Sequence, residues 1–314
     1  MGDSSFSNPI VIRTFGWLYA FLLGAWLVVI ALRFHLSNDT RRELLLRVRS
    51  WWMILILTSF GLLSNKVAPF ALFSFVSFLA LREFLSIIPV RSVDRGALFW
   101  VYLAIPLQYT WAYLNWFQLF TLFIPLYLFM FLSLRLVLTG ETKGIFSAVG
   151  TLQWVVVLSV FSVSHIVYLF NIAHEGSHQA GPVGLILYLL ALTQLNDVFQ
   201  YIFGKLFGRR SIVPKISPKK TWEGLGGGVL MTTLLSFLIA PTLTAMSQFQ
   251  SMVFGMLISL SGFFGDITMS AIKRDLKLKD TGKLLPGHGG ILDRIDSLMF
   301  SSPLFFYSYA WICL

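Results

Sequence analysis

Long apolar stretches separated by short polar segments run along the whole chain. A helix that crosses a bilayer needs about 20 mostly apolar residues, and ten stretches approach that length. They lie at residues 16–34, 51–63, 67–86, 97–113, 116–138, 151–172, 183–204, 225–246, 251–272 and 297–314. The second stretch is short and predicts a tilted or partial span. The pattern therefore predicts an all-α polytopic integral membrane protein with about 9–10 transmembrane helices and short loops.

The composition agrees with a membrane protein. Hydrophobic residues make up 56% of the chain and charged residues 12%, whereas soluble domains carry about 25% charged residues. This balance excludes a soluble enzyme, a disordered protein and a free nucleic-acid-binding protein. Cys313 is the single cysteine, so the chain forms no internal disulfide and no cysteine metal cluster.

The positive charges predict the orientation of the helices. Alternate loops carry 19 Lys and Arg residues, while the intervening loops carry two. The cation-rich loops are residues 35–50, 87–96, 139–150, 205–224 and 273–296. Because short cationic loops stay in the cytoplasm, we expect these five loops on the cytoplasmic side of a bacterial inner membrane. With ten spans, both termini then lie outside.

The polar chemistry is concentrated in the second half of the chain. Residues 1–180 predict a scaffold of lipid-facing helices, and residues 181–314 predict a catalytic region that includes loops 205–224 and 273–296. In the scaffold, the pair Arg82 and Glu83 is interpreted as local neutralisation or snorkelling near a helix end.

Two polar segments near the C-terminus predict an ion and phosphate site. Asp266, Ser270 and Lys273 follow spacings of four and three, which place them on one helical face, and carboxylates with few other ligands suit Mg²⁺. Downstream, the glycines around His288 make a tight turn whose N–H groups can approach an anion closely. Asp293 and Asp296, three residues apart, share a helical face.

A third polar segment runs from Asn196 and Asp197 to the basic pair Lys219 and Lys220. This loop also fits a topology determinant or a contact with anionic lipids. The glycines at 224 and 226–228 indicate helix packing rather than a phosphate loop, because no Gly-Lys-Ser/Thr sequence follows them.

The run from Ser270 through Lys273-Arg274, Lys279-Asp280 and Pro286-Gly-His-Gly-Gly-Ile-Leu-Asp-Arg-Ile-Asp296 resembles the signature of the CDP-diacylglycerol synthases, also called phosphatidate cytidylyltransferases. Asn196-Asp197 and residues 217–224 resemble the same family, so the likeness covers residues 195–300. It implies the reaction CTP + phosphatidate → CDP-diacylglycerol + diphosphate. The partners it implies are CTP, phosphatidate in the membrane and a second copy of the chain, with no nucleic acid.

The resemblance also implies roles for individual residues. Asp266 and Asp293 are the expected Mg²⁺ ligands, for one ion or two, and participation of a monovalent cation stays open. The expected catalytic residues are Asp266, Asp293, Lys273 and Asp296, of which Asp296 alternatively pairs with Arg294. The expected substrate-binding residues are Asn196, Asp197, Lys219, Lys220, Ser270, Arg274, Lys279, Asp280, His288, Gly289, Gly290 and Arg294.

Three other functions match parts of the sequence. A cytidylyltransferase for another lipid phosphate would carry the same signature. An anion or lipid transporter would use the intramembrane Asp197 and Asp266, but it would leave the glycine-rich turn unexplained. The run from His174 to His178 matches the H-E-x-x-H pattern of zinc proteases, but its Gly176 and the following Gly181-Pro182 disfavour the helix that such a site needs.

Overall fold

The computed structural model describes residues 8–31, 38–172, 180–282 and 289–313, most of which are helical. Helices form at every predicted apolar stretch, because a backbone in lipid must satisfy its hydrogen bonds within its own segment. The helices are α1 (Pro9–Ala31), α2 (Asn38–Leu63), α3 (Val67–Ile87), α4 (Arg95–Tyr113), α5 (Phe117–Leu122), α6 (Phe129–Val137), α7 (Ile145–Val156), α8 (Ser162–Ile172), α9 (Gly181–Phe207), α10 (Trp222–Leu243), α11 (Gln248–Asp275) and α12 (Leu292–Cys313). Two π-helical segments, η3 (Phe123–Leu128) and η4 (Val157–Phe161), join α5 to α6 and α7 to α8, and a 3₁₀ turn, η2 (Ser92–Asp94), precedes α4.

Eight helical segments in the described ranges are long and apolar enough to cross a membrane. They are α1, residues 44–63 of α2, α3, α5–α6, α7–α8, α9, α10 and α11. The second predicted stretch, expected to be short, is therefore part of a 20-residue apolar segment. The all-α polytopic membrane architecture is confirmed, although α4 and α12, which coincide with two of the ten predicted stretches, fall outside this set of eight.

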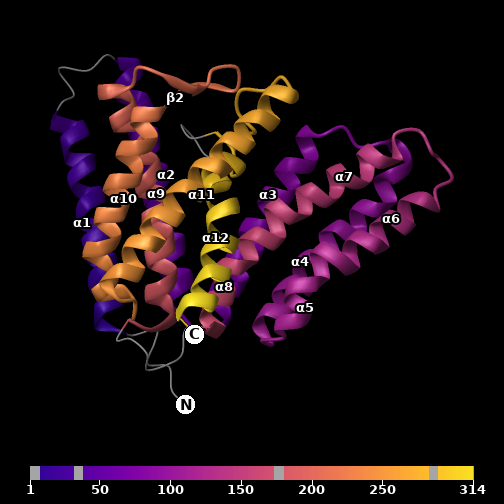
Figure 1. Ribbon diagram of the computed structural model, residues 1–314, viewed down its shortest axis with the longest axis horizontal. Helices are drawn as coiled ribbons and strands as arrows, with labels where there is room; N and C mark the ends of the chain where they lie inside the picture. Colours follow the sequence, from indigo (N-terminus) through magenta and orange to yellow (C-terminus); the bar gives the residue numbers. More distant parts are fainter. Residues whose placement is uncertain (1–7, 32–37, 173–179, 283–288, 314) are drawn as a thin grey trace.

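The helices form two groups that meet at α8 and α12 and where α2 packs on α3 (Figure 1). One group contains α1, α2 and α9–α12, and the other contains α3–α7, which lean away from it. Within the first group, α9 packs on α10 and α11, and α11 packs on α12. Because α12 also contacts α8 and α3, it connects the scaffold half of the chain to the half that carries the polar segments.

A small β-hairpin interrupts the otherwise helical fold between α9 and α10. Strands β1 (Ser211–Val213) and β2 (Ser217–Thr221) are antiparallel and lie inside the cation-rich loop 205–224. The hydroxyl of Thr221 accepts a hydrogen bond from the N–H of Gly224 at 3.1 Å and so caps α10. Strand β2 packs against α9, α10 and α11, which places the hairpin over one end of these helices (Figure 1).

Glycines allow close packing of α10 on α9, as the sequence predicted for the glycines at 224 and 226–228. A Cβ at Gly224 would lie 2.9 Å from the carbonyl oxygen of Gln200, and one at Gly227 or Gly228 would clash with a side chain of α9. Gly226 faces open space instead. The packing role is therefore confirmed for Gly224, Gly227 and Gly228 and is wrong for Gly226.

Candidate active site

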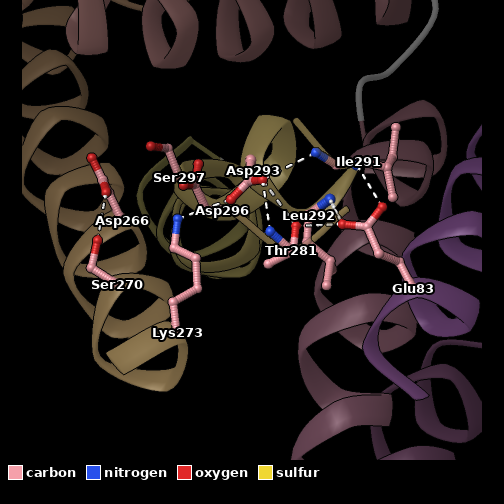
Figure 2. A network of polar contacts seen from close by, with 11 residues as sticks. Glu83, Asp266, Ser270, Lys273, Thr281, Ile291, Leu292, Asp293, Asp296 and Ser297 are labelled. Carbon is pink, nitrogen blue, oxygen red and sulfur yellow. Dashed lines mark hydrogen bonds and ion pairs between the residues drawn. The ribbon is translucent and has the colours of Figure 1, made fainter. Parts of the chain in front are cut away.

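Charged side chains gather where α9 and α11 end and α12 begins. On α11, Asp266, Ser270 and Lys273 lie along one face, as their spacing predicted (Figure 2). The hydroxyl of Ser270 donates to Oδ1 of Asp266 at 3.4 Å. Lys273 extends toward α12, where its Nζ lies 2.9 Å from Oδ1 of Asp293. The predicted face of Asp266, Ser270 and Lys273 on α11 is therefore confirmed, and it faces the start of α12.

Lys220 reaches the same face from the hairpin. Its ammonium forms an ion pair with Asp266, donates a hydrogen bond to Oε1 of Gln200 at 3.3 Å and lies 5.8 Å from the centre of the Phe263 ring. Burial lowers the pKa of Lys220, but the charges of Asp266 and Asp197 outweigh that effect and raise the pKa above its ordinary value. Lys220 is therefore a permanent positive charge at neutral pH.

Asp293, in the first turn of α12, accepts hydrogen bonds on both carboxylate oxygens. Its Oδ1 receives the Lys273 ammonium, and its Oδ2 accepts from the backbone N–H groups of Thr281 at 3.1 Å and Gly290 at 3.0 Å. Only 8% of the Asp293 side chain is exposed. Gly289 has a φ of +81°, and a Cβ there would lie 2.7 Å from Oδ2 of Asp293. Gly289 thus lets the backbone approach this carboxylate.

Two further carboxylates, Asp197 on α9 and Asp296 on α12, lie beside Asp266. The hydroxyl of Ser297 lies 3.1 and 3.0 Å from the two carboxylate oxygens of Asp197, and the N–H of Ser297 donates to Oδ1 of Asp296 at 2.8 Å. Gly265 allows α11 and α12 to approach here, because a Cβ at this position would clash with the backbone of Asp296. The charges of the three carboxylates repel one another, so the cluster needs cations to balance it.

The two expected metal ligands, Asp266 and Asp293, are each paired with a lysine. Asp266 pairs with Lys220, and Asp293 pairs with Lys273. In the described ranges, no three His, Cys, Asp or Glu side chains converge as a set of ligands. Mg²⁺ takes one or two protein carboxylates and completes its shell with water and substrate phosphates. The donor set therefore fits an ion that is shared with a bound phosphate rather than one enclosed by protein.

The remaining expected binding residues differ in their surroundings. Nε of Arg294 is buried and has no hydrogen-bond partner among the described residues. Nε of Arg274 donates to the carbonyl of Ile216 at 3.2 Å and so ties α11 to the hairpin. Arg274 is exposed, and so are Lys219, Lys279 and Asp280. His288 and the run from His174 to His178 lie outside the described residues.

Asn196 is fully buried, and its amide joins three helices. Its Oδ1 accepts from the hydroxyls of Ser259 at 2.5 Å and Thr232 at 3.2 Å, and its Nδ2 donates to the carbonyl of Ser259 at 3.4 Å. These bonds hold α9 against α10 and α11 and so fix the adjacent Asp197. The expected contact between Asn196 and the substrate stays a prediction.

Glu83, near the end of α3, is a site residue that the sequence did not reveal. The sequence predicted that Glu83 and Arg82 neutralise each other locally. For Glu83 this is wrong, because its carboxylate lies against the segment that precedes α12 (Figure 2). It accepts hydrogen bonds from the N–H groups of Ile291 at 2.8 Å and Leu292 at 3.2 Å, and from the hydroxyl of Thr281. The sequence shows only that Glu83 is a carboxylate near a helix end. That observation does not identify a partner 208 residues away.

Comparison with known proteins identifies the family of this chain. The family model described as "Cytidylyltransferase family" matches residues 45–312. "Uncharacterized protein YnbB" of Escherichia coli is 42% identical over 301 residues, which are 96% of this chain and 99% of that protein. "Phosphatidate cytidylyltransferase 5, chloroplastic" of Arabidopsis thaliana is 42% identical over 132 residues, 41% of this chain and 33% of that protein. "Phosphatidate cytidylyltransferase" of Staphylococcus saprophyticus is 37% identical over 138 residues, 44% of this chain and 51% of that protein.

The two kinds of match differ in extent. The similarity to the E. coli protein spans nearly the whole of both chains, whereas the similarity to the two named phosphatidate cytidylyltransferases covers 33% and 51% of their length. The family match includes α3, α9, α11 and α12, which together carry the charged cluster. The chain therefore belongs to the cytidylyltransferase family, that of the CDP-diacylglycerol synthases.

Proposed function

We propose that this chain is a phosphatidate cytidylyltransferase. It joins the CMP portion of CTP to the phosphate of phosphatidate, which gives CDP-diacylglycerol and diphosphate. The observation that carries the proposal is the cluster of four aspartates, Asp197, Asp266, Asp293 and Asp296, interleaved with the ammonium groups of Lys220 and Lys273 at one end of the helix bundle.

In this reaction an oxygen of the phosphatidate phosphate attacks the α-phosphorus of CTP, and the bond from that phosphorus to the oxygen of the β-phosphate breaks. A phosphate monoester carries a charge of about −1.5 to −2 at pH 7, so the attacking group is already ionised and needs no strong base. The main barrier is the approach of this anion to a triphosphate. Positioning and charge neutralisation therefore supply most of the catalysis, as in phosphoryl transfer.

The cations of the cluster suit that task. Lys220 and Lys273 are ion-paired and are held by β2 and α11, respectively, so an incoming phosphate meets ammonium groups that are already oriented. Arg294 adds a buried Nε without a partner among the described residues. The exposed Lys219 and Lys279 extend the positive charge outward, which favours the entry of a polyanion.

Asp266 and Asp293 would hold Mg²⁺, as one ion or two, in contact with the substrate phosphates. When bound, the metal would withdraw negative charge from the triphosphate and so favour departure of diphosphate. The protein's own part is to hold both carboxylates in place. The ion pairs with Lys220 and Lys273 do this, together with the N–H groups of Thr281 and Gly290 that bind Asp293.

The location of the cluster suits a lipid substrate. Asp197 and Asp266 belong to helices long and apolar enough to cross a membrane, and the cluster lies near the ends of these helices, so the acyl chains of phosphatidate can remain in the bilayer while its phosphate reaches the cations. The cation-rich loops favour the cytoplasmic face of a bacterial inner membrane for this end of the molecule. We also propose that two copies of this chain form a homodimer.

The proposal is tested with the purified full-length protein in detergent micelles, supplied with Mg²⁺ and labelled CTP. We expect label to enter the lipid fraction with phosphatidate, and much less with a polyprenyl phosphate or an ether-linked analogue. Labelling of another lipid phosphate alone would refute phosphatidate as the substrate, and labelling of none would refute the enzyme. Asp293→Asn should abolish labelling, while the matched control Asp275→Asn, at an exposed position of α11, should retain it.

A further inference from the structure

Helix α12 begins without a capping side chain of its own. The carbonyl of Ile291 accepts the first helical hydrogen bonds, from the N–H groups of Arg294 and Ile295, so Ile291 occupies the N-cap position. Ser, Thr, Asp and Asn are preferred there because their oxygens accept from the first free N–H groups of the helix. Isoleucine has no such oxygen, and the start of α12 therefore needs an acceptor from elsewhere.

Glu83 of α3 supplies that acceptor. Its Oε2 accepts from the N–H of Ile291 at 2.8 Å and its Oε1 from the N–H of Leu292 at 3.2 Å. A negative charge at a helix N-terminus is also favoured by the helix dipole. Gly290 makes room for the carboxylate, because a Cβ there would collide with it and would lie 2.5 Å from Oγ1 of Thr281.

Thr281 connects this cap to Asp293. Its hydroxyl contacts Oε1 of Glu83 and lies 3.0 Å from Oδ2 of Asp293. A hydroxyl has one proton to donate, and Oδ2 of Asp293 already accepts from the backbone N–H groups of Thr281 and Gly290. The hydroxyl proton therefore belongs to Glu83, while the backbone of the same residue holds Asp293.

We propose that Glu83 is a positioning residue, through which the scaffold helix α3 caps α12 and fixes the Asp293 carboxylate opposite Lys273. The cap itself is independent of the reaction, whereas the effect on turnover rests on the proposed function. Three contacts carry the inference: the Thr281 hydroxyl donates to Glu83, the Thr281 N–H donates to Asp293, and the Lys273 ammonium donates to Asp293 (Figure 2). Glu83 touches neither substrate nor metal in this account.

Hydrogen–deuterium exchange of the full-length protein tests the cap directly. In Glu83→Gln, the amides of residues 289–293 should exchange at least about fivefold faster, the factor that corresponds to ~1 kcal/mol of lost capping. The matched control Glu141→Gln, at an exposed position between α6 and α7, should leave them unchanged. Unchanged exchange at 289–293 in Glu83→Gln would overturn the cap, and so would faster exchange spread equally over α9, α10 and α11.

Steady-state kinetics test the effect on Asp293. We expect Glu83→Gln to lower kcat at least about tenfold while the KM for CTP changes less than about threefold, because the lysines that bind phosphate are still present. Glu83→Asp, which retains the carboxylate, should recover part of both the kcat and the protection. Unchanged kcat with faster exchange would refute the positioning role, as would failure of Glu83→Asp to exceed Glu83→Gln. If wild type released no diphosphate, the proposed function would fail while the exchange result would still decide the cap.

Discussion

Gly265→Ala tests whether the activity of the site depends on the close packing of α11 against α12. The residue lies on α11 immediately before Asp266, at the point where α11 touches α12. A Cβ added there would lie 3.2 Å from both the carbonyl carbon of Asp296 and Cα of Ser297, and closer still to the carbonyl oxygen of Asp296. All three atoms are backbone, so no side chain can rotate away to make room.

The size of the effect follows from that crowding. Ordinary contact begins at 3.4 Å, so α12 must retreat from α11, and overpacking of this kind costs about 1–3 kcal/mol of stability. The same movement separates Asp266 on α11 from Asp293 and Asp296 on α12. A displacement of about 1 Å in a catalytic arrangement can lower the rate about 100-fold. We therefore expect a loss of activity much larger than the loss of folded protein.

The assay is diphosphate release from CTP and phosphatidate, combined with thermal unfolding in the same detergent. Gly265→Ala should lose about 100-fold in kcat and still show a cooperative unfolding transition. Gly226→Ala is the matched control, because Gly226 is also helical but a Cβ there meets nothing within 4 Å, and we expect it to keep its activity. Activity of Gly265→Ala within roughly threefold of wild type would refute the reasoning.

Three further predictions concern the polar contacts around the site. Thr232→Val removes a hydrogen bond to the buried Asn196 and should lower the free energy of unfolding by ~1 kcal/mol, measured as a lower Tm with activity retained. Lys220→Met leaves Asp266 without its ammonium partner and should lower kcat/KM for CTP at least about tenfold. Because the folded-state pKa of Lys220 is raised, its ion pair stabilises the protein fully below the unfolded pKa of about 10.4 and loses that contribution only above it. The Tm difference between wild type and Lys220→Met should therefore be no smaller at about pH 9 than at about pH 7, and a smaller difference at the higher pH would contradict this.

The helices could be predicted because their pattern is local. An apolar stretch long enough to cross a bilayer must be helical, whatever its neighbours are, so every predicted stretch coincides with a helix. The hairpin could not be predicted in this way. Its strands are three and five residues long, and Pro218 together with two lysines in β2 gives no alternation of apolar and polar residues.

In the candidate site, too, the contacts within one helix could be predicted and the contacts between distant segments could not. The face formed by Asp266, Ser270 and Lys273 could be predicted because helical spacing alone places the three side chains together. The ion pair between Lys220 and Asp266 depends on the hairpin, and spacing within one helix carries no information about it. The contact of Glu83 with the start of α12 joins residues 208 positions apart and required the packing of α3 against α12.

We propose that the charged cluster formed by Asp197, Asp266, Asp293, Asp296, Lys220 and Lys273 makes CDP-diacylglycerol. The most direct measurement is detection of that product by mass spectrometry after the purified protein, in vesicles that contain phosphatidate, receives CTP and Mg²⁺. We expect CDP-diacylglycerol and an equal amount of diphosphate from the wild type, and neither product from Asp293→Asn. Absence of CDP-diacylglycerol from the folded wild type, or full turnover by Asp293→Asn, would contradict it.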